Sequence, residues 1–219
     1  MIRIYPSLIG GDILALRDQI RLLDSHCAGY HLDLMDGHFV PNITWGPAYI
    51  NAIAKATTKQ LWVHMMVTDP AFWFDRLELP LESMVDFHIE TAIDHYVLMR
   101  MIQHAGMQAG IAISPGTSLQ LLDPLLSLVD YVLIMSVQPG FSGQQFIAES
   151  IERIQELAAI KSTKHYDFSI AVDGGITMFN INQTIEAGAA YIAIASGLFA
   201  NHKPVETLQH IMKNIKKSM

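Results

Sequence analysis

Short runs of apolar and β-branched residues alternate along the chain with segments whose apolar residues recur at helical spacing. The runs follow one another at intervals of roughly 25 to 30 residues, which is typical of repeated βα units that build a parallel sheet. The predicted strands are Arg3–Ser7, Gly29–Met35, Gln60–Met66, Met84–Ile89, Gln108–Ile113, Tyr131–Val137, Phe168–Asp173 and Tyr191–Ser196. Eight parallel strands are the number that closes a (β/α)8 barrel.

The segments between these runs carry the helical pattern, with one exception. Apolar residues recur every three or four positions in Asp12–Asp24, Tyr96–His104, Ser150–Ala159 and Met178–Ala187, so these segments are predicted helices. Asp12 stands just before the first of these patterns and is its predicted N-cap. Gln138–Ala148 shows neither pattern. Long connections of this kind in compact domains are often binding loops.

An open, doubly wound parallel sheet is the competing architecture. It normally carries a dinucleotide loop of the form Gly-x-Gly-x-x-Gly after its first strand. The corresponding residues here, Ser7-Leu8-Ile9-Gly10-Gly11-Asp12, do not have that spacing. In a barrel, active-site residues lie at the C-terminal ends of the strands, where the chemically interesting residues of this chain are found. The sequence therefore predicts an α/β protein with a (β/α)8 TIM barrel.

Composition and charge fit one such domain over residues 1–219. Hydrophobic residues make up 51% of the chain and charged residues 16%, and no linker divides it. The formal charge of −7 gives no reason to expect nucleic acid. No apolar run approaches the ~18 residues of a membrane helix, and the single Cys27 cannot form an internal disulfide. We expect a cytoplasmic protein that binds neither nucleic acid nor membranes.

Histidines and aspartates end three of the predicted strands. His31 and Asp33 are two positions apart, so both side chains point to the same face of their strand. His64 and Asp173 stand at the C-terminal ends of the third and seventh strands. Two imidazoles and two carboxylates form a mixed nitrogen and oxygen site that suits Zn(II), Fe(II), Mn(II) or Co(II). The sequence therefore predicts a divalent metal site.

Asp33 and Asp173 are also candidate proton-transfer groups. They belong to the second and seventh strands, which lie nearly opposite each other around an eight-stranded ring. A carbon held between them meets one carboxylate on each face, which suits removal of a proton from one side and its return on the other. His88, at the end of the fourth strand, either supports a metal ligand or has a purely structural role.

Methionines and glycine-rich loops complete the candidate pocket. Met35, Met66 and Met135 each stand near the end of a different strand, where they either fill the core or form an apolar wall that excludes water. Glycine-rich loops follow strands six, seven and eight, and backbone N–H groups in such loops commonly bind phosphate in barrels. The expected substrate-binding residues are Ser7, His64, Gly140, Phe141, Ser142, Gly143, Asp173, Gly174, Gly175, Ser196 and Gly197.

Four segments that contain these residues resemble the ribulose-phosphate 3-epimerase family. They are His31–Thr44, His64–Val67, Met135–Gln144 and Val172–Ile176, and the likeness runs from Pro6-Ser7 to Ser196-Gly197. The resemblance implies a ribulose-phosphate-binding type of barrel with a divalent metal on His31, Asp33, His64 and Asp173. It also implies that Asp33 and Asp173 accept and donate the proton, that Ser7 contacts the substrate, and that the protein is a homo-oligomer.

Departures from the family pattern concern the sugar more than the chemistry. Leu8-Ile9-Gly10-Gly11-Asp12 replaces the usual Leu-Ser-Ala-Asp stretch, and Gln138 stands where Asn, Asp or Glu is usual before Pro139. The Ser196–Phe199 and Asp24-Ser25-His26 stretches are somewhat more similar to the related D-allulose-6-phosphate 3-epimerases. We expect C3 epimerisation of D-ribulose 5-phosphate to D-xylulose 5-phosphate through an enediolate, with D-allulose 6-phosphate or another ketose phosphate as the alternative substrate.

Other barrel classes fit the residues less well. A metal-dependent hydrolase is expected to show His-x-His at the end of the first strand, where this chain has Tyr5-Pro6-Ser7. A decarboxylase of the orotidine type would resemble Asp-x-Lys near the third strand, and no Lys stands among these acids. A non-catalytic binding barrel would not need the opposed carboxylates.

Overall fold

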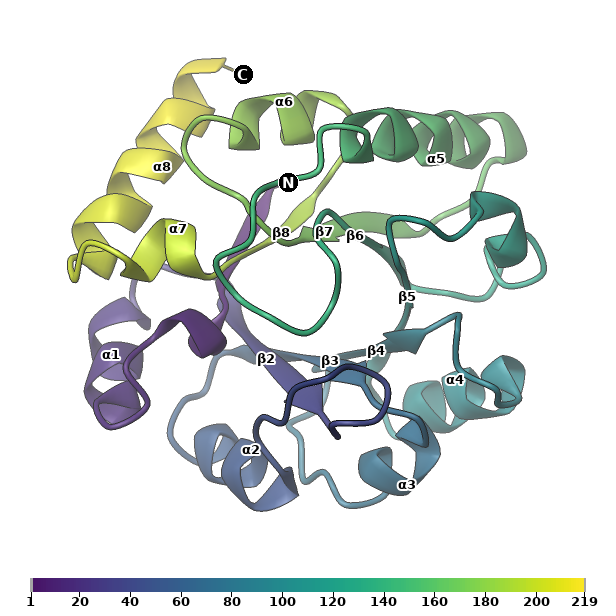
Figure 1. Cartoon of the computed structure of the whole chain (residues 1–219), viewed down its shortest axis with the longest axis horizontal. Helices are drawn as coiled ribbons and strands as arrows, with labels where there is room; N and C mark the ends of the chain where they lie inside the picture. The colour runs from purple at the N-terminus through teal and green to yellow at the C-terminus, as the bar shows by residue number, and fades with distance from the viewer. Residues whose placement is uncertain (1, 219) are drawn as a thin grey trace.

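Eight parallel strands form a ring in the computed structural model, which describes residues 2–218, with side chains described through residue 215. Residues 1 and 219 of the predicted 1–219 domain lie outside the described range. The strands are β1 (Arg3–Pro6), β2 (Gly29–Met35), β3 (Gln60–Met66), β4 (Met84–His88), β5 (Gln108–Ile113), β6 (Tyr131–Met135), β7 (Ser169–Asp173) and β8 (Tyr191–Ile194). Figure 1 views this ring with the helices outside it. The predicted TIM barrel is confirmed.

The strands β1 and β2 are the neighbours in the ring that are not joined by a ladder of hydrogen bonds. Hydrogen-bonded pairing runs in the order β1-β8-β7-β6-β5-β4-β3-β2, so each strand except β1 and β2 has a ladder on both sides. Between β1 and β2 the described residues form a single parallel bridge, Ser7 with His31. The junction that completes the barrel is therefore made at two of the candidate site residues.

Helices cover the outer face of the ring. They are α1 (Leu16–Leu23), α2 (Pro47–Ala54), α3 (Pro70–Phe74), α4 (His95–His104), α5 (Ser150–Lys164), α6 (Ile181–Glu186), α7 (Ser196–Phe199) and α8 (Pro204–Ser218). Short 3-10 helices follow β1, at η1 (Leu8–Gly10), and β5, at η2 (Leu119–Leu122). None of the described helices is long and apolar enough to cross a lipid bilayer.

The predicted start of the first helix is wrong. Asp12 does not cap α1, which begins at Leu16 after Ala15. Instead, Oδ1 of Asp12 accepts a hydrogen bond of 3.0 Å from the backbone N–H of Leu14, two residues further on. An aspartate can close a local turn of this kind in competition with a helix, and here the helix begins three residues later than an N-cap at Asp12 predicts.

Apolar residues pack on both faces of the barrel wall. Alternate side chains such as Leu32, Val63 and Val85 point outward and pack beneath the helices. Inside the ring, a second cluster fills the lower part of the barrel and contains Tyr5, Trp62, Met84, Tyr131, Leu133, Ala171 and Ala193. This filled interior leaves the polar ends of the strands at the mouth as the place where a ligand can enter.

The predicted loop Gln138–Ala148 contains no helix or strand. In Figure 1 this loop, between β6 and α5, passes in front of the centre of the ring. It is tied to the opposite side of the mouth by Nδ2 of Asn42, which donates a hydrogen bond of 2.7 Å to the Gly140 carbonyl. The loop is thus held over the barrel mouth by the segment that follows β2.

Candidate active site

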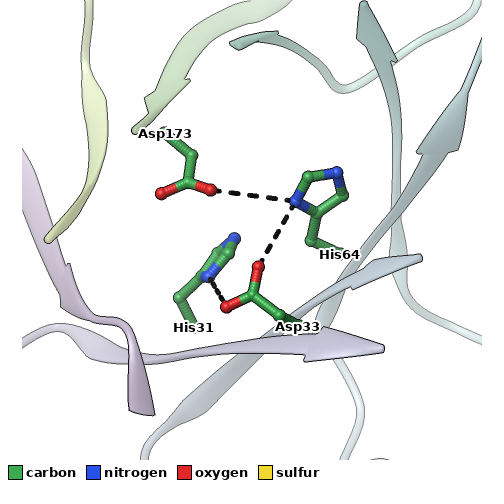
Figure 2. A group of neighbouring side chains, drawn as sticks. All are labelled: His31, Asp33, His64 and Asp173. Atoms are coloured by element: carbon green, nitrogen blue, oxygen red, sulfur yellow. Dashed lines mark ion pairs between the residues drawn. The ribbon is translucent and has the colours of Figure 1, made fainter. Parts of the chain in front are cut away.

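Four side chains meet at the C-terminal ends of β2, β3 and β7. His31 and Asp33 come from β2, His64 from β3 and Asp173 from β7, and Figure 2 shows them directed toward one another. Each offers one ligand atom, and these atoms all lie within 4.8 Å of one another. His31, His64 and Asp33 are buried, while Asp173 is partly exposed toward the mouth. The residues predicted as metal ligands are therefore neighbours in space.

Hydrogen bonds and close contacts fix this group. Oδ2 of Asp33 accepts a hydrogen bond of 2.9 Å from the Ser7 hydroxyl and lies 3.4 Å from Nδ1 of His31. Nδ1 of His64 lies 3.7 Å from Oδ1 of Asp33 and 3.9 Å from Oδ2 of Asp173 (Figure 2). The second imidazole therefore stands between the two carboxylates.

The free nitrogen atoms suit a cation. Nε2 of His31 and Nδ1 of His64 are buried and have no hydrogen-bond partner among the described residues. An unpartnered buried polar atom is costly, and a lone pair aimed at a cation satisfies it. With one oxygen each from Asp33 and Asp173, the donor set has the nitrogen and oxygen character that borderline divalent metals prefer. The residues present thus fit a divalent metal ion.

Electrostatics distinguish the two histidines. Burial, reinforced by nearby His88 and His31, holds the pKa of His64 well below its usual range, so this imidazole is neutral. Burial also lowers the pKa of His31, but the charges of Asp33 and Asp173 outweigh it and raise that pKa to about 9. Without a cation, the site therefore holds a proton on His31, which a divalent metal would replace.

Burial also affects the carboxylate on the seventh strand. It raises the pKa of Asp173 to about 7, with His31 opposing the shift and the charge of Asp33 adding to it. An ordinary aspartate is fully ionised near neutral pH, whereas burial shifts this one toward its protonated form. A carboxyl group poised in this way suits both acceptance and donation of a proton.

A pocket of about 480 Å³ opens above the four residues. Its lining includes Met35, Met66 and Met135, all of them buried, so these methionines face the pocket as well as filling space at the top of the barrel. From the loops, the lining includes Gly140, Phe141, Ser142, Gly143, Gly174, Gly175 and Ser196, together with Ser7, Asp33 and Asp173. The wall of this pocket thus combines the two aspartates, apolar methionine side chains and glycine-rich loop backbone.

Three predicted residues lie outside this lining. His31 and His64 are fully buried, and Gly197 packs against the backbone of the loop after β7. A Cβ at Gly197 would collide with the carbonyl oxygen of Ile176. Gly197 is therefore explained by a close approach within the protein itself.

Gly175, on the pocket wall, is also explained by a close approach within the protein itself. Gly175 has a φ of +62°, and a Cβ there would come within 2.6 Å of the backbone nitrogen of Phe146. Gly143 differs: its φ is +82°, but a Cβ would meet nothing within 4 Å. Of the predicted phosphate-loop glycines, Gly143 is the one at which an added Cβ would enter free space.

Several residues near the site were not predicted. Ile9, Val137, Gln144 and Ile176 also line the pocket. Deeper in the barrel, buried Asp86 on β4 accepts hydrogen bonds from Trp62 Nε1 at 2.5 Å and the Tyr131 hydroxyl at 3.0 Å. Burial raises the pKa of Asp86 to about 7. Asp86 stands two positions before His88, so the alternation that located His31 and Asp33 would also have located it.

Comparison with known proteins decides the family. The profile of the ribulose-phosphate 3 epimerase family matches residues 3–199. The chain belongs to the ribulose-phosphate 3-epimerase family. It is an epimerase that acts on carbohydrates.

Individual members of the ribulose-phosphate 3-epimerase family match over most of their length. The ribulose-phosphate 3-epimerase of Treponema pallidum is 37% identical over 196 residues, covering 89% of this chain and 90% of that protein. The corresponding enzyme of Aquifex aeolicus is 35% identical over 214 residues, covering 97% and 96%. The crystal structure of 3-hexulose-6-phosphate synthase from Salmonella typhimurium overlaps 100% of both chains with a TM-score of 0.69 at 14% identity, which shows a shared fold alone.

Proposed function

We propose that this enzyme interconverts D-ribulose 5-phosphate and D-xylulose 5-phosphate by moving a proton at C3. The observation that carries the proposal is the placement of Asp33 and Asp173, from β2 and β7, on the wall of one pocket. Membership of the family and the matched relatives, which are ribulose-phosphate 3-epimerases, support this substrate.

The chemistry follows from the two carboxylates. The C3 hydrogen is α to the C2 ketone, so its removal gives an enediolate. One aspartate accepts that proton on one face of the sugar, and the other donates a proton to the opposite face. In the reverse direction they exchange roles. Met35, Met66 and Met135 exclude water from the reacting carbons, which keeps the carboxylates effective.

A divalent metal ion would be held by His31, Asp33, His64 and Asp173. When bound, such an ion supplies positive charge that stabilises the developing enediolate oxygens. Ser7 orients this group through its hydrogen bond to Asp33 and its contact with His31, whose Nδ1 lies 3.2 Å from the hydroxyl. Zn(II), Fe(II), Mn(II) and Co(II) are the candidates, because each accepts mixed imidazole and carboxylate ligands.

The phosphate group of the substrate would lie between the loops after β6, β7 and β8. Backbone N–H groups of Gly143, Gly174, Gly175 and Ser196 are the proposed donors, since these residues line the same pocket as the aspartates. The Ser142 hydroxyl and the neighbouring Gly140 and Phe141 complete this part of the wall. Gly197, near the start of α7, supports the last loop.

We further propose that the enzyme assembles as a homo-oligomer. Several large apolar side chains near the mouth are exposed, among them Ile13, Leu14 and Ile43. Association with a second copy would remove such surface from water. Light scattering coupled to size-exclusion chromatography measures the assembly, and a monomer at micromolar concentration would contradict this part.

A side-by-side assay tests the substrate. Purified enzyme is given D-ribulose 5-phosphate and D-allulose 6-phosphate at equal concentrations, and the C3 epimers are quantified. We expect the pentulose phosphate to have the larger kcat/KM. A larger kcat/KM for the hexulose phosphate would reassign the substrate while retaining the chemistry. Absence of turnover with either sugar would refute the proposed function.

A further inference from the structure

We propose that His88 and Glu90 act as positioning residues that fix the tautomer of His64, so that the Nδ1 lone pair of His64 faces the metal site. The inference rests on the metal site proposed above. Neither His88 nor Glu90 lines the pocket, and neither belongs to the group of four proposed metal ligands.

A continuous chain of contacts leads away from His64. Its Nε2 lies 2.9 Å from Nε2 of His88, and Nδ1 of His88 lies 3.0 Å from Oε2 of Glu90. Both imidazoles are fully buried. The backbone N–H of Ser114 donates a hydrogen bond of 2.8 Å to the other carboxylate oxygen of Glu90 and fixes its orientation.

The chemistry of each group determines where the protons are. An ionised carboxylate can only accept, so Glu90 requires the His88 proton on Nδ1. Two imidazole nitrogens 2.9 Å apart need one donor and one acceptor, so with the His88 proton on Nδ1 its Nε2 accepts from an Nε2–H group of His64. With its single proton on Nε2, neutral His64 has a lone pair on Nδ1. That nitrogen is the one between Asp33 and Asp173.

Carboxyl oxygens lie near both nitrogens of the His64 ring, beyond hydrogen-bond distance. Oδ1 of Asp86 is 3.8 Å from Nε2, while oxygens of Asp33 and Asp173 are 3.7 and 3.9 Å from Nδ1, so their attraction for a proton is similar on the two sides. The 2.9 Å contact with His88 is at hydrogen-bond distance and exists on the Nε2 side, while the described residues give the buried Nδ1 no hydrogen-bond partner. The contact with His88 therefore decides the tautomer.

Metal affinity is the first readout, because partners behind a metal-bound histidine typically change affinity or activity by about 10–100-fold. His88→Leu has similar volume but cannot accept a hydrogen bond. His88→Gln places an amide oxygen where it can accept from His64 Nε2–H. Glu90→Gln removes the charge, and Glu152→Gln on the exposed side of α5 is the matched control. Cobalt(II) dissociation constants are measured by competition with a chromophoric chelator.

The expected pattern separates hydrogen bonding from packing. His88→Leu and Glu90→Gln should weaken cobalt binding about 10–100-fold, while His88→Gln and Glu152→Gln should remain close to the native protein. Circular dichroism establishes that each variant is folded. Native affinity in folded His88→Leu, or equal losses in His88→Leu and His88→Gln, would overturn the proposal.

The tautomer itself is the second readout. In the full chain labelled with ¹⁵N-histidine, two-bond ¹H–¹⁵N spectra identify the protonated nitrogen, and His64→Ala identifies the signals of that ring. We expect His64 to carry its proton on Nε2 before and after zinc is added. A proton on Nδ1 in the metal-free protein would overturn this inference. Failure of the native protein to bind metal would refute the metal site instead, so the two failures are distinguishable.

Discussion

The Ser7 hydroxyl donates a hydrogen bond of 2.9 Å to Oδ2 of Asp33, across the junction between β1 and β2. Oγ of Ser7 also lies 3.2 Å from Nδ1 of His31 and can accept a hydrogen bond from it. Ser7 thereby fixes two of the four residues that form the proposed metal site, and it leaves Oδ1 of Asp33 and Nε2 of His31 free to act.

Replacement of Ser7 by Ala tests this role. Loss of the hydroxyl leaves Asp33 and His31 without their shared partner, so we expect metal affinity or kcat/KM to fall about 10–100-fold. Ser162→Ala, on the exposed side of α5, is the control and should behave like the native enzyme. Native metal affinity and native kinetics in Ser7→Ala would contradict the role assigned to the hydroxyl.

Asp33→Asn and Asp173→Asn test the two-base mechanism. Asparagine is nearly isosteric but cannot accept the proton, so epimerisation should fall by about 10²–10⁴-fold, with any metal loss adding to this. In Asp173→Asn, one epimer should still exchange its C3 hydrogen with solvent deuterium through Asp33, without conversion to the other. Mass spectrometry measures the exchange. Near-native turnover in either variant would remove that aspartate from the mechanism.

Metal removal should abolish activity. Exhaustive dialysis against a chelator is expected to give an inactive enzyme, and Zn(II), Fe(II), Mn(II) or Co(II) should restore turnover. His64→Ala removes one of four proposed ligands and should bind metal more weakly. Metal content is measured by elemental analysis alongside activity. Full activity in a protein that analysis shows to be metal-free would exclude a role for the metal.

The phosphate site is best tested at Gly143. A Cβ there meets no protein atom within 4 Å, whereas one at Gly175 would displace the backbone of Phe146. Gly143→Ala places a side chain at a positive φ, which costs of order 1 kcal/mol. We expect a raised KM for the phosphorylated ketose with unchanged metal content.

The matching change in the substrate gives an independent measurement. Free ribulose lacks the dianion, so its KM should be higher, and its kcat lower if remote binding energy holds C3 between the aspartates. Gly143→Ala should impair the phosphorylated sugar more than the free sugar. Equal efficiency of the native enzyme with both sugars would refute the phosphate site.

Asp36, at the end of β2, should titrate far below an ordinary carboxylate. Burial alone would raise its pKa, but hydrogen bonds from the backbone of Thr68, Phe39 and His38 lower it from 3.8 to about 2. A pKa below that of the unfolded chain means that the carboxylate stabilises the fold fully above pH 4 or so. That stabilisation is lost as the pH falls toward about 2.

Two measurements check the lowered pKa of Asp36. Carboxyl ¹³C NMR shifts should place the Asp36 midpoint near 2, and a midpoint near 4 would contradict the assignment. Asp36→Asn keeps one acceptor oxygen and loses the other, so it should be about 1 kcal/mol less stable at neutral pH. The difference in unfolding free energy between variant and native protein should shrink as the pH falls from 4 toward 2.

Much of the barrel follows from local pattern. The bounds of β2, β3 and β5 match the predicted runs, because an apolar strand that is buried on both sides has a clear sequence signature. The strands β4, β6 and β8 end one or two residues earlier than predicted. Ile89 and Val137 are apolar but lie just beyond β4 and β6, so hydrophobicity does not mark the boundary at these two strands.

The candidate site was predictable where residues alternate on one strand, as His31 and Asp33 do. What alternation does not give is the register between strands. In the sheet Asp33 is level with His64, and His64 with Asp86, so three polar residues of neighbouring strands share one layer. The contact between His64 and His88 depends on that register, and the sequence left the role of His88 open for this reason.

The single bridge between β1 and β2 connects the polar site to the stability of the barrel. Every other pair of neighbouring strands is held by a ladder, whereas the contacts at this junction include the bridge of Ser7 with His31, the hydrogen bond of Ser7 to Asp33 and one backbone hydrogen bond from Ala28 to Ile4. A ligand that binds these residues binds the closed barrel in preference to an opened one. Its binding therefore adds to the free energy of unfolding. Occupation of the active site is therefore expected to raise the temperature at which the barrel unfolds.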